Sequence, residues 1–493
     1  MSAATPSMLI DAAELARRVE GTWLTPPGEV TVTAVEIDSR LCAPGTLFVA
    51  LPGQNADGHD YITAASANGA AAALVSRDPG TLPHSITCPL LRVDDVEAAL
   101  ARLGAFGRAA HRVAGGHLVA ITGSVGKTGS KEMLAHMLCR LGGCHANRAS
   151  FNNHLGVPLT LAALPDAPLA AVQEIGMNAS GEIRTLSALA QPDIAVITRI
   201  ADSHAGFFDS LDDIAAAKAE IFDGLTAGGT AILNADDAYF AFHGSRATTA
   251  GASRIIGFGT ATSAEARLLD VTADETGMNV RADILGTDLA FRMGTRGQHW
   301  AHNATAMLAA VAALDLDVRD AAEYLHDFSE LKGRGAISSG IFDGMVMTIV
   351  DDSYNAGPAS MTAAFNTIAA TPPQIMVLSD MLELGDTSVA AHAALAPAIA
   401  ALQPRILITI GPMMAAMAVS LPGSIEHHAA DTPDNATAAL RAALRENDRV
   451  FIKGSNGSGA CHVAAAIIAG FTAASGINAG ANAGANGGAS HAA

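Results

Sequence analysis

The sequence predicts an α/β protein of three domains built on doubly wound, mostly parallel sheets. Its 493 residues are too many for a single hydrophobic core. Short apolar runs typical of buried strands alternate with segments of helical periodicity along most of the chain. One of these runs, His117 to Thr122, ends in a glycine-rich turn followed by Lys-Thr, the layout of a phosphate-binding loop. Together these observations predict a central sheet of the P-loop type.

Composition and patterning divide the chain into four parts. Residues 1–112 mix short strands and helices, and we expect them to form a smaller N-terminal α/β domain. Residues 113–328 contain the phosphate loop and form the central domain, and residues 329–474 form a Rossmann-like C-terminal α/β domain. Residues 475–493 are a tail of Ala, Gly and Asn without periodicity, which we expect to be disordered and to which we assign no role.

The apolar runs place the strands. In the central domain we expect strands at Ala170 to Ile175, Ile194 to Ile200 and Thr230 to Asn234, in addition to the one before the phosphate loop. In the C-terminal domain we expect them at Met345 to Val350, Gln374 to Leu378, Ile406 to Ile410 and Arg449 to Lys453. Many of these strands end in polar residues, and ligands bind at the carboxyl ends of parallel strands. Each polar residue alone is as well explained by a helix cap, but the set predicts a shared active-site rim.

Composition limits the class of function. The formal net charge of −19 argues against a nucleic-acid partner. The five cysteines are odd in number and form no Cys-x-x-Cys, which indicates a reducing compartment, and we expect a cytoplasmic protein. No secretory signal opens the chain and no apolar run is long enough to span a membrane.

The phosphate loop is the most specific motif. It runs from Gly123 through Ser124, Val125, Gly126, Lys127 and Thr128 to Gly129. Its glycines let backbone N–H groups converge on phosphate oxygens, and the following helix, which we expect to end at Gly142-Gly143, adds a positive field. Lys127 can reach the terminal phosphates, and the hydroxyl of Thr128 can bind Mg²⁺. The alternative is a glycine-rich turn with an ordinary surface lysine.

Two further charged residues are candidates. Glu174 ends a predicted strand and is the best candidate for a second Mg²⁺ ligand, since hard cations take oxygen ligands. The alternative for Glu174 is a helix-capping carboxylate. Lys218 lies in an Ala-rich helix, and from that helix alone we interpret it as facing solvent.

Three polar segments complete the set. Asn152 and Asn153 can offer donors and acceptors to a substrate, although alone they indicate a turn. His299 and Asn303 share one helix face, with a surface histidine as the alternative. The acid, aromatic and amide side chains that follow the first C-terminal strand are typical of a binding loop: Asp352, Tyr354 and Asn355.

The order and spacing of these motifs resemble the Mur ligases, the ATP-dependent amide-forming enzymes of peptidoglycan precursor synthesis. The resemblance covers nearly the whole chain except the tail. Its most specific segments are Thr122–Thr128, Asn152–Pro158, Glu174–Asn178, Ala217–Ile221, Asp351–Ala356 and Asp380–Gly385. The last two favour the member that adds D-alanyl-D-alanine to a UDP-N-acetylmuramoyl-tripeptide. The chain departs from the family pattern at Ser379, Gly357 and Gly129-Ser130.

The resemblance implies roles for the ATP and metal residues. Lys127 and Thr128 would hold ATP phosphates and Mg²⁺, and Glu174 and His204 would bind metal. Lys218 would carry a carbamate made from CO₂ and act as a further metal ligand, which replaces our solvent-facing interpretation. The other implied contacts with ATP are Asn303 at the adenine end, Arg334 at the γ-phosphate, and Asp352, Tyr354 and Asn355 along the nucleotide site.

The resemblance also implies where the acceptor binds. The N-terminal domain would hold the UDP-sugar, and the substrate contacts would be Ser39, Arg40, Asp57, Gly58, His59, Asn152, Asn153 and Lys453. ATP would phosphorylate the terminal carboxylate of the tripeptide, and the amine of D-alanyl-D-alanine would displace phosphate from the acyl phosphate. We expect a monomer that acts on small molecules and has no nucleic-acid partner.

Other functions stay open at this point. One is a sibling ligase that adds a different amino acid, or a ligase of the folylpolyglutamate synthase type. Another is a non-catalytic nucleotide-binding or scaffold protein of the same fold. A simple P-loop kinase or ATPase would need neither the N-terminal domain nor the helix of Lys218.

Overall fold

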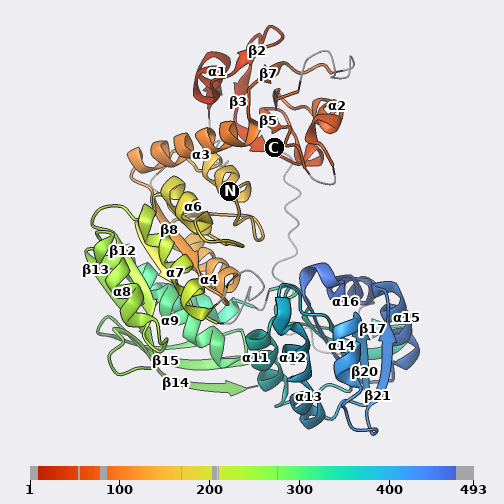
Figure 1. Cartoon of the computed structure of the whole chain (residues 1–493). Coiled ribbons are helices and arrows are strands. Elements are labelled where there is room, and N and C mark those ends of the chain that lie inside the picture. Colours follow the sequence, from red (N-terminus) through yellow and green to blue (C-terminus); the bar gives the residue numbers. More distant parts are fainter. Residues whose placement is uncertain are drawn as a thin grey trace.

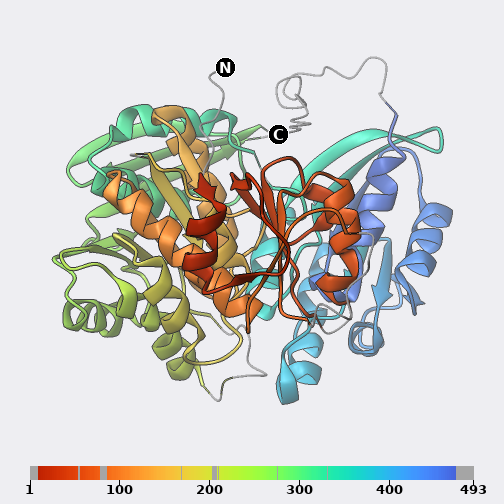
Figure 2. The same ribbon diagram turned by 90° about the horizontal axis from the view of Figure 1, so that it is seen from above.

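The structure is a computed structural model that describes residues 9–53, 56–77, 86–167, 169–201, 208, 210–274, 276–329 and 331–472. Three α/β domains follow one another along the chain, each built around its own sheet, of five, nine and six strands (Figure 1). The N-terminal domain lies above the other two, which stand side by side (Figures 1 and 2). The predicted three-domain α/β fold is confirmed, whereas the boundaries at 112 and 328 stay predictions. No helix of the described part is long and apolar enough to cross a lipid bilayer.

The N-terminal sheet is small and mixed. Its strand order is β2 (Thr22–Trp23), β7 (Leu90–Arg92), β6 (Ala72–Val75), β5 (Thr46–Val49) and β4 (Ala34–Glu36). Strand β2 is antiparallel to β7 and the other pairs are parallel. A separate antiparallel pair joins β1 (Ile10–Asp11) to β3 (Thr31–Val32). The helices are α1 (Ala12–Val19), α2 (Ile62–Ala67) and α3 (Val96–Val113).

The central sheet is parallel over most of its width. Its order begins with β9 (Cys144–Ala146), β10 (Ala170–Glu174), β8 (His117–Thr122), β11 (Ile194–Ile197), β12 (Thr230–Asn234) and β13 (Arg254–Gly259), all parallel. Strands β8 and β12 have the predicted bounds, and β10 and β11 end earlier than predicted. Successive residues of β8 enter opposite cores, Val119 on one face and Leu118 on the other, as expected of a sheet covered on both sides.

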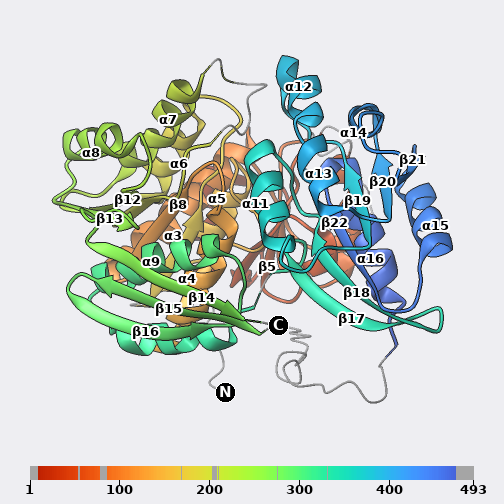
Figure 3. The ribbon, with the colours of Figure 1, turned by 90° about the horizontal axis from the view of Figure 1, so that it is seen from below.

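Three long strands extend this sheet and were not predicted. They are β14 (Ala266–Asp274), β15 (Gly277–Ile284) and β16 (Thr287–Met293), and β15 is antiparallel to both of its neighbours. The turn between β15 and β16 is Leu285-Gly286, and both residues have positive φ, 54° and 86°. Two such residues form the tight turn that matches the twist of a hairpin. Figure 3 shows these strands along the lower rim of the central domain.

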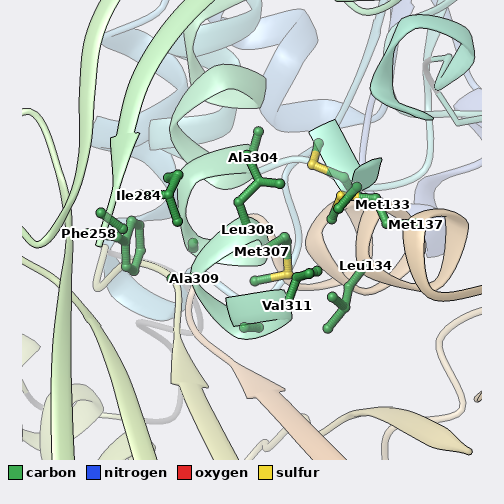
Figure 4. Close-up of a cluster of buried hydrophobic side chains, with 14 of the residues drawn as sticks. Met133, Leu134, Met137, Phe258, Ile284, Ala304, Met307, Leu308, Ala309 and Val311 are labelled. Carbon is green, nitrogen blue, oxygen red and sulfur yellow. The ribbon is translucent and has the colours of Figure 1, made fainter. Parts of the chain in front are cut away.

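Helices cover both faces of the central sheet. One face carries α4 (Lys127–Leu141) and α9 (Gln298–Ala313), whose buried side chains interlock in Figure 4. Met133, Leu134 and Met137 of α4 belong to the same apolar cluster as Met307 and Val311 of α9. The other face carries α5 (Gly156–Ala162), α6 (Glu182–Ala190), α7 (Leu211–Ala219) and α8 (Phe240–Thr249). This cover on both faces confirms the doubly wound architecture.

Helix α5 also completes the core of the N-terminal domain. Its Leu159 and Ala162 lie in the same buried cluster as Leu47 and Leu100. The backbones of α3 and α5 approach closely, because a Cβ at Gly107 would lie 2.2 Å from the carbonyl oxygen of Leu161. The N-terminal and central domains therefore share one apolar contact.

The C-terminal sheet has six strands. Their order is β17 (Ala336–Phe342), β18 (Met345–Asp352), β22 (Asp448–Lys453), β19 (Ile375–Ser379), β20 (Ile406–Ile410) and β21 (Glu426–Ala430). Among the described strands of this sheet, only β17 is antiparallel to its neighbour. The helices are α11 (Pro358–Ile368), α12 (Ser388–Ala393), α13 (Ala396–Leu402), α14 (Pro412–Ala418), α15 (Pro433–Ala443) and α16 (Ala460–Ala469). The predicted strands lie within two residues of these bounds.

Candidate active site

The phosphate loop connects β8 to α4, as the sequence predicts. Gly123 and Gly126 have φ of 146° and 86°, values that side chains disfavour. A Cβ at Gly123 would lie 2.0 Å from Oγ1 of Thr198, and one at Gly126 would lie 3.2 Å from Nδ2 of Asn303. The Oγ of Ser124 is buried and finds no hydrogen-bond partner within the described part of the chain. Thr198 and Asn303 thus leave little room for a side chain at the two glycines. Without side chains at these positions, the loop backbone can approach a ligand at the helix N-terminus closely.

Lys127 folds back over its own loop. Its Nζ donates hydrogen bonds to the carbonyl oxygens of Gly123 and Ser124 at 2.7 and 3.4 Å. Burial lowers the pKa of Lys127, and the nearby carboxylate of Glu174 opposes that shift. The ammonium is therefore held against the backbone of the loop, which does not fit the alternative of an ordinary surface lysine.

Thr128 and Glu174 lie side by side. The hydroxyl of Thr128 donates to Oε2 of Glu174 at 2.8 Å, and the amide of Asn152 donates to Oε1 at 2.7 Å. Glu174 is only 1% exposed, and its carboxylate does not cap a helix, so the helix-cap interpretation is wrong. Its backbone N–H donates to Oδ1 of Asn147 at 2.9 Å, which fixes the end of β10. Two hard oxygen atoms, of a hydroxyl and a carboxylate, therefore meet beside the phosphate loop.

These two oxygens fit Mg²⁺ better than a metal that needs a full protein cage. Among the described residues, no group of three or more His, Cys, Asp or Glu side chains has the arrangement of a metal site. Mg²⁺ keeps several waters and binds through one or two protein ligands together with substrate phosphates. His204, the other predicted metal ligand, lies outside the described residues, so its role stays a prediction.

Lys218 lies in α7 and is fully buried, so the solvent-facing interpretation is wrong. In the described part of the chain its Nζ has no hydrogen-bond partner. The pKa of Lys218 is held well below its ordinary value, first by burial and then by the positive charge of Lys127. A buried ammonium without partners is costly, so this side chain favours the neutral amine or a modified form.

The C-terminal domain contributes a cation to the same place. The guanidinium of Arg334 donates to Oγ1 of Thr128 at 2.9 Å and lies 4.3 Å from the ring centre of Tyr354. The segment that carries Arg334 is tied to the end of β18, because Gly333 N–H donates to Asp351 at 3.1 Å and its carbonyl accepts from Tyr354 N–H at 2.8 Å. The predicted γ-phosphate contact thus lies against the phosphate loop.

The other C-terminal candidates lie together at the carboxyl ends of β18 and β22. The ammonium of Lys453 lies 2.8 Å from the carboxylate of Asp352 and donates to the carbonyl oxygen of Asn355 at 2.9 Å. Burial raises the pKa of Asp352, and Lys453 opposes this shift. Residues predicted for the nucleotide and for the substrate are therefore paired with each other.

The predicted asparagines are also placed. Asn152 bonds Glu174, whereas Oδ1 of Asn153 accepts from the N–H groups of Leu155 and Gly156 and so caps the start of α5. This capping confirms the turn that the sequence indicates. Asn303 packs against Gly126 of the phosphate loop. The adenine contact of Asn303 and the substrate contact of Asn153 stay predictions.

The predicted UDP-sugar contacts lie in the N-terminal domain. Arg40 is exposed and pairs with Asp38 at 2.7 Å. His59 is buried, with Nδ1 at 2.6 Å from Asp57 and Nε2 accepting from Ser76 N–H at 3.0 Å. Both nitrogens of His59 are therefore occupied within the protein, and this residue orders the loop. Roles for Ser39, Arg40, Asp57, Gly58 and His59 in substrate binding stay predictions.

The sequence did not single out Lys131 of α4 or residues Asn147 to Ser150, which directly follow β9. Ser150 accepts a hydrogen bond from the Tyr354 hydroxyl at 2.6 Å and lies 3.5 Å from Oγ1 of Thr128. Lys131 of α4 is fully buried and donates to the carbonyl oxygens of Asn147 and Ala149 at 2.8 and 2.9 Å. A polar run directly after a strand was the available signal, but it carries no recognisable motif.

Known proteins share both the sequence and the architecture. Residues 31–108 match the Mur ligase family catalytic domain, residues 121–312 the Mur ligase middle domain, and residues 333–456 the Mur ligase glutamate ligase domain. The UDP-N-acetylmuramoyl-tripeptide–D-alanyl-D-alanine ligase of Bacillus subtilis is 34% identical over 90% of this chain and 95% of its own length. The protein of that name in Escherichia coli is 33% identical over 87% and 92%.

A solved structure agrees with these matches. The crystal structure of MurF from Acinetobacter baumannii superposes with a TM-score of 0.79 at 28% identity, and it covers 94% of this chain and 100% of its own. The same three domains in the same order thus recur in sequence and in space. The chain belongs to the Mur ligase family.

Proposed function

We propose that the protein joins D-alanyl-D-alanine to UDP-N-acetylmuramoyl-tripeptide at the expense of ATP, in the synthesis of peptidoglycan precursors. Relatives that bear this activity in their names align over most of the chain. The observation that carries the proposal is the contact between two domains at the phosphate loop, where Arg334 bonds Thr128 beside Glu174. A site of this kind can transfer phosphate from ATP to a carboxylate and enclose the acyl phosphate that results.

The chemistry explains the need for ATP. A carboxylate is a poor acceptor for an amine, so its oxygen first attacks the γ-phosphorus of ATP and ADP departs. The neutral amine of the dipeptide then attacks the acyl carbon, an amide bond forms, and phosphate leaves with the former carboxylate oxygen. Lys127 and Arg334 place positive charge around the transferring group, which lowers the barrier to phosphoryl transfer.

Two residues are suited to hold Mg²⁺. The oxygens of Thr128 and Glu174 lie 2.8 Å apart beside the loop, and His204 and Lys218 are the further predicted ligands. Bound there, the ion would neutralise charge on the ATP phosphates. Asn152 holds the Glu174 carboxylate from its other oxygen and so orients it.

Lys218 is suited to carry a carbamate. Its amine is buried without a hydrogen-bond partner among the described residues, and its lowered pKa favours the neutral form that reacts with CO₂. Addition of CO₂ to this neutral amine and loss of a proton would convert it into a negatively charged, carboxylate-like group. The positive charge of Lys127 nearby would stabilise that anion.

The domain arrangement fits an acyl phosphate, which water would destroy. The acceptor would reach the site from the N-terminal domain through Ser39, Arg40 and the loop of His59. The dipeptide would bind on the C-terminal side near Lys453. Closing the C-terminal domain on the phosphate loop would then exclude water. We expect a monomer that acts in the cytoplasm.

One assay tests the proposal. Phosphate release from ATP is measured with UDP-N-acetylmuramoyl-tripeptide present, with and without D-alanyl-D-alanine. Release that requires both, with a product heavier by one dipeptide less water, is the expected result. Release that responds instead to a single amino acid would assign a sibling activity. ATP binding without turnover, whatever acceptor is supplied, would point to a non-catalytic protein.

A further inference from the structure

One five-residue segment contacts all three domains. This segment, Asn147 to Phe151, follows the edge strand β9 and precedes α5, and it is called the junction segment below. It lies in the central domain, directly beside the Thr128–Glu174 pair.

Toward the N-terminal domain, the junction segment makes an ion pair. A guanidinium nitrogen of Arg148 lies 2.8 Å from each carboxylate oxygen of Glu36. Glu36 is the last residue of β4, and the predicted UDP-sugar contacts Ser39 and Arg40 follow in the next turn. Phe151 packs against the apolar core of the same domain. A ligand that displaces the end of β4 on binding would therefore displace Arg148 as well.

Toward the C-terminal domain, the contact is a hydrogen bond. The Tyr354 hydroxyl donates to Oγ of Ser150 at 2.6 Å, and the ring of Tyr354 supports the guanidinium of Arg334. The Oγ of Ser150 lies 3.5 Å from Oγ1 of Thr128. Ser150 therefore lies between the phosphate loop and the residues that close on it.

Within the central domain, the junction segment is held in one conformation. The buried ammonium of Lys131 binds the carbonyl oxygens of Asn147 and Ala149 at 2.8 and 2.9 Å. Ala149 has φ of 45°, in the left-handed region that is unfavourable for a non-glycine residue. Oδ1 of Asn147 holds the backbone N–H of Glu174. A segment clamped in this way transmits a displacement instead of absorbing it.

We infer that the junction segment couples the N-terminal domain to the phosphate loop, so that the acceptor bound near Glu36 strengthens ATP binding at Thr128 through Arg148 and Ser150. The inference rests on the proposed function, because it names the acceptor that binds the N-terminal domain. Arg148 and Ser150 act through other residues, so they are positioning residues. By linkage, ATP must strengthen acceptor binding by the same factor.

The test measures this coupling without turnover. Calorimetry gives the Kd of a non-hydrolysable ATP analogue with and without saturating UDP-N-acetylmuramoyl-tripeptide. For the wild-type protein we expect the acceptor to tighten nucleotide binding by roughly tenfold, within the usual range for coupled sites. Removing the Arg148–Glu36 pair by Arg148→Met or Glu36→Gln should lower that factor about threefold, the measure of a partly exposed ion pair. The double variant should lose no more than either single one.

Controls separate coupling from folding. Arg148 is 52% exposed and Glu36 is 15% exposed, so neither substitution empties a core. The affinity of these variants for the nucleotide alone should stay within about twofold of wild type, since the ion pair is not in the phosphate loop. Arg292→Met removes a comparable surface pair with Asp274 on the distant β14–β16 strands and should leave the coupling intact. Ser150→Ala should weaken the coupling as Arg148→Met does.

The outcomes are distinguishable. Lost coupling in the Arg148, Glu36 and Ser150 variants but not in Arg292→Met supports the inference. Wild-type coupling in all of them, or no coupling in the wild-type protein, overturns it even if the enzyme turns over normally. Absence of turnover in the wild-type phosphate assay overturns the proposed function instead.

Discussion

Arg334 of the C-terminal domain donates a hydrogen bond to the Thr128 hydroxyl of the phosphate loop at 2.9 Å. The contact joins residues that lie 206 positions apart in the sequence. Because the same hydroxyl is expected to bind Mg²⁺, Arg334 must move toward the phosphates when ATP enters. The contact therefore places Arg334 where, as proposed above, it would bring positive charge to the γ-phosphate.

Tyr354 should act on Arg334 through its ring more than through its hydroxyl. The guanidinium lies 4.3 Å from the ring centre, so Tyr354→Ala removes the surface that orients Arg334. We expect kcat to fall about 100-fold for Arg334→Met, the usual loss for one transition-state donor. Tyr354→Phe keeps the ring and should cost only about fivefold. The measurement is kcat from steady-state kinetics at saturating ATP. Equal losses of kcat for Tyr354→Phe and Tyr354→Ala would contradict the prediction.

The Thr128–Glu174 pair should set the affinity for magnesium. Glu174→Gln keeps the shape of the side chain but removes its charge, so the Mg²⁺ concentration for half-maximal activity should rise at least about tenfold. Thr128→Val should do the same, whereas Thr128→Ser keeps the hydroxyl and should stay near wild type. Activity is titrated against Mg²⁺ at fixed ATP. An unchanged titration for Glu174→Gln would remove this residue from the metal site.

Lys218→Ala should abolish turnover, and added acetate or formate should restore part of it. The small carboxylate would occupy the space left by the side chain and replace the carbamate. Lys127→Ala is the matched control, because a missing cation cannot be replaced by an anion, so no rescue is expected there. Phosphate release is measured against acetate concentration, with thermal unfolding to check each fold. A folded Lys218→Ala protein that acetate does not rescue would count against the carbamate.

His145 should make the stability of the protein depend on pH. Burial lowers the pKa of this β9 residue from 6.5 to about 4. Between these two pKa values His145 is protonated in the unfolded chain but neutral in the folded one. The contribution of this residue to stability is therefore complete above about pH 6.5 and falls as the pH drops toward 4. The loss is at most about 3 kcal/mol. His145→Gln should flatten the difference in urea unfolding between pH 7 and pH 5, and His154→Gln, at an exposed histidine, should not.

The features that could be predicted from the sequence are those determined by interactions between residues close together in the chain. The bounds of β8, β12 and β20 follow from apolar runs bounded by polar residues, and the phosphate loop follows from its glycines. The environment of Lys218 does not follow, because an Ala-rich helix shows no polar face to orient it. Strands β14 to β16 were missed since their exposed residues interrupt the apolar pattern.

Contacts between distant segments are the least visible. Nothing around Glu36 or Arg148 indicates that they pair, since they are 112 residues apart and each is ordinary in its own context. The family resemblance predicts residues that contact ligands, whereas the role that we infer for the junction segment depends on its contacts with other residues. Only the folded structure brings Glu36 of the N-terminal domain into contact with Arg148 of the junction segment.

The sharing of α5 has a consequence for how the molecule melts. Leu159 and Ala162 complete the N-terminal core, so that domain cannot lose its packing without exposing part of the central one. The two apolar clusters of the C-terminal domain consist of residues between Ile337 and Phe471 alone. Calorimetry should accordingly resolve two cooperative units, not three, with the last third of the chain unfolding by itself. Both units would contact a bound nucleotide. Saturation with nucleotide should therefore reduce the temperature difference between the two heat-absorption peaks.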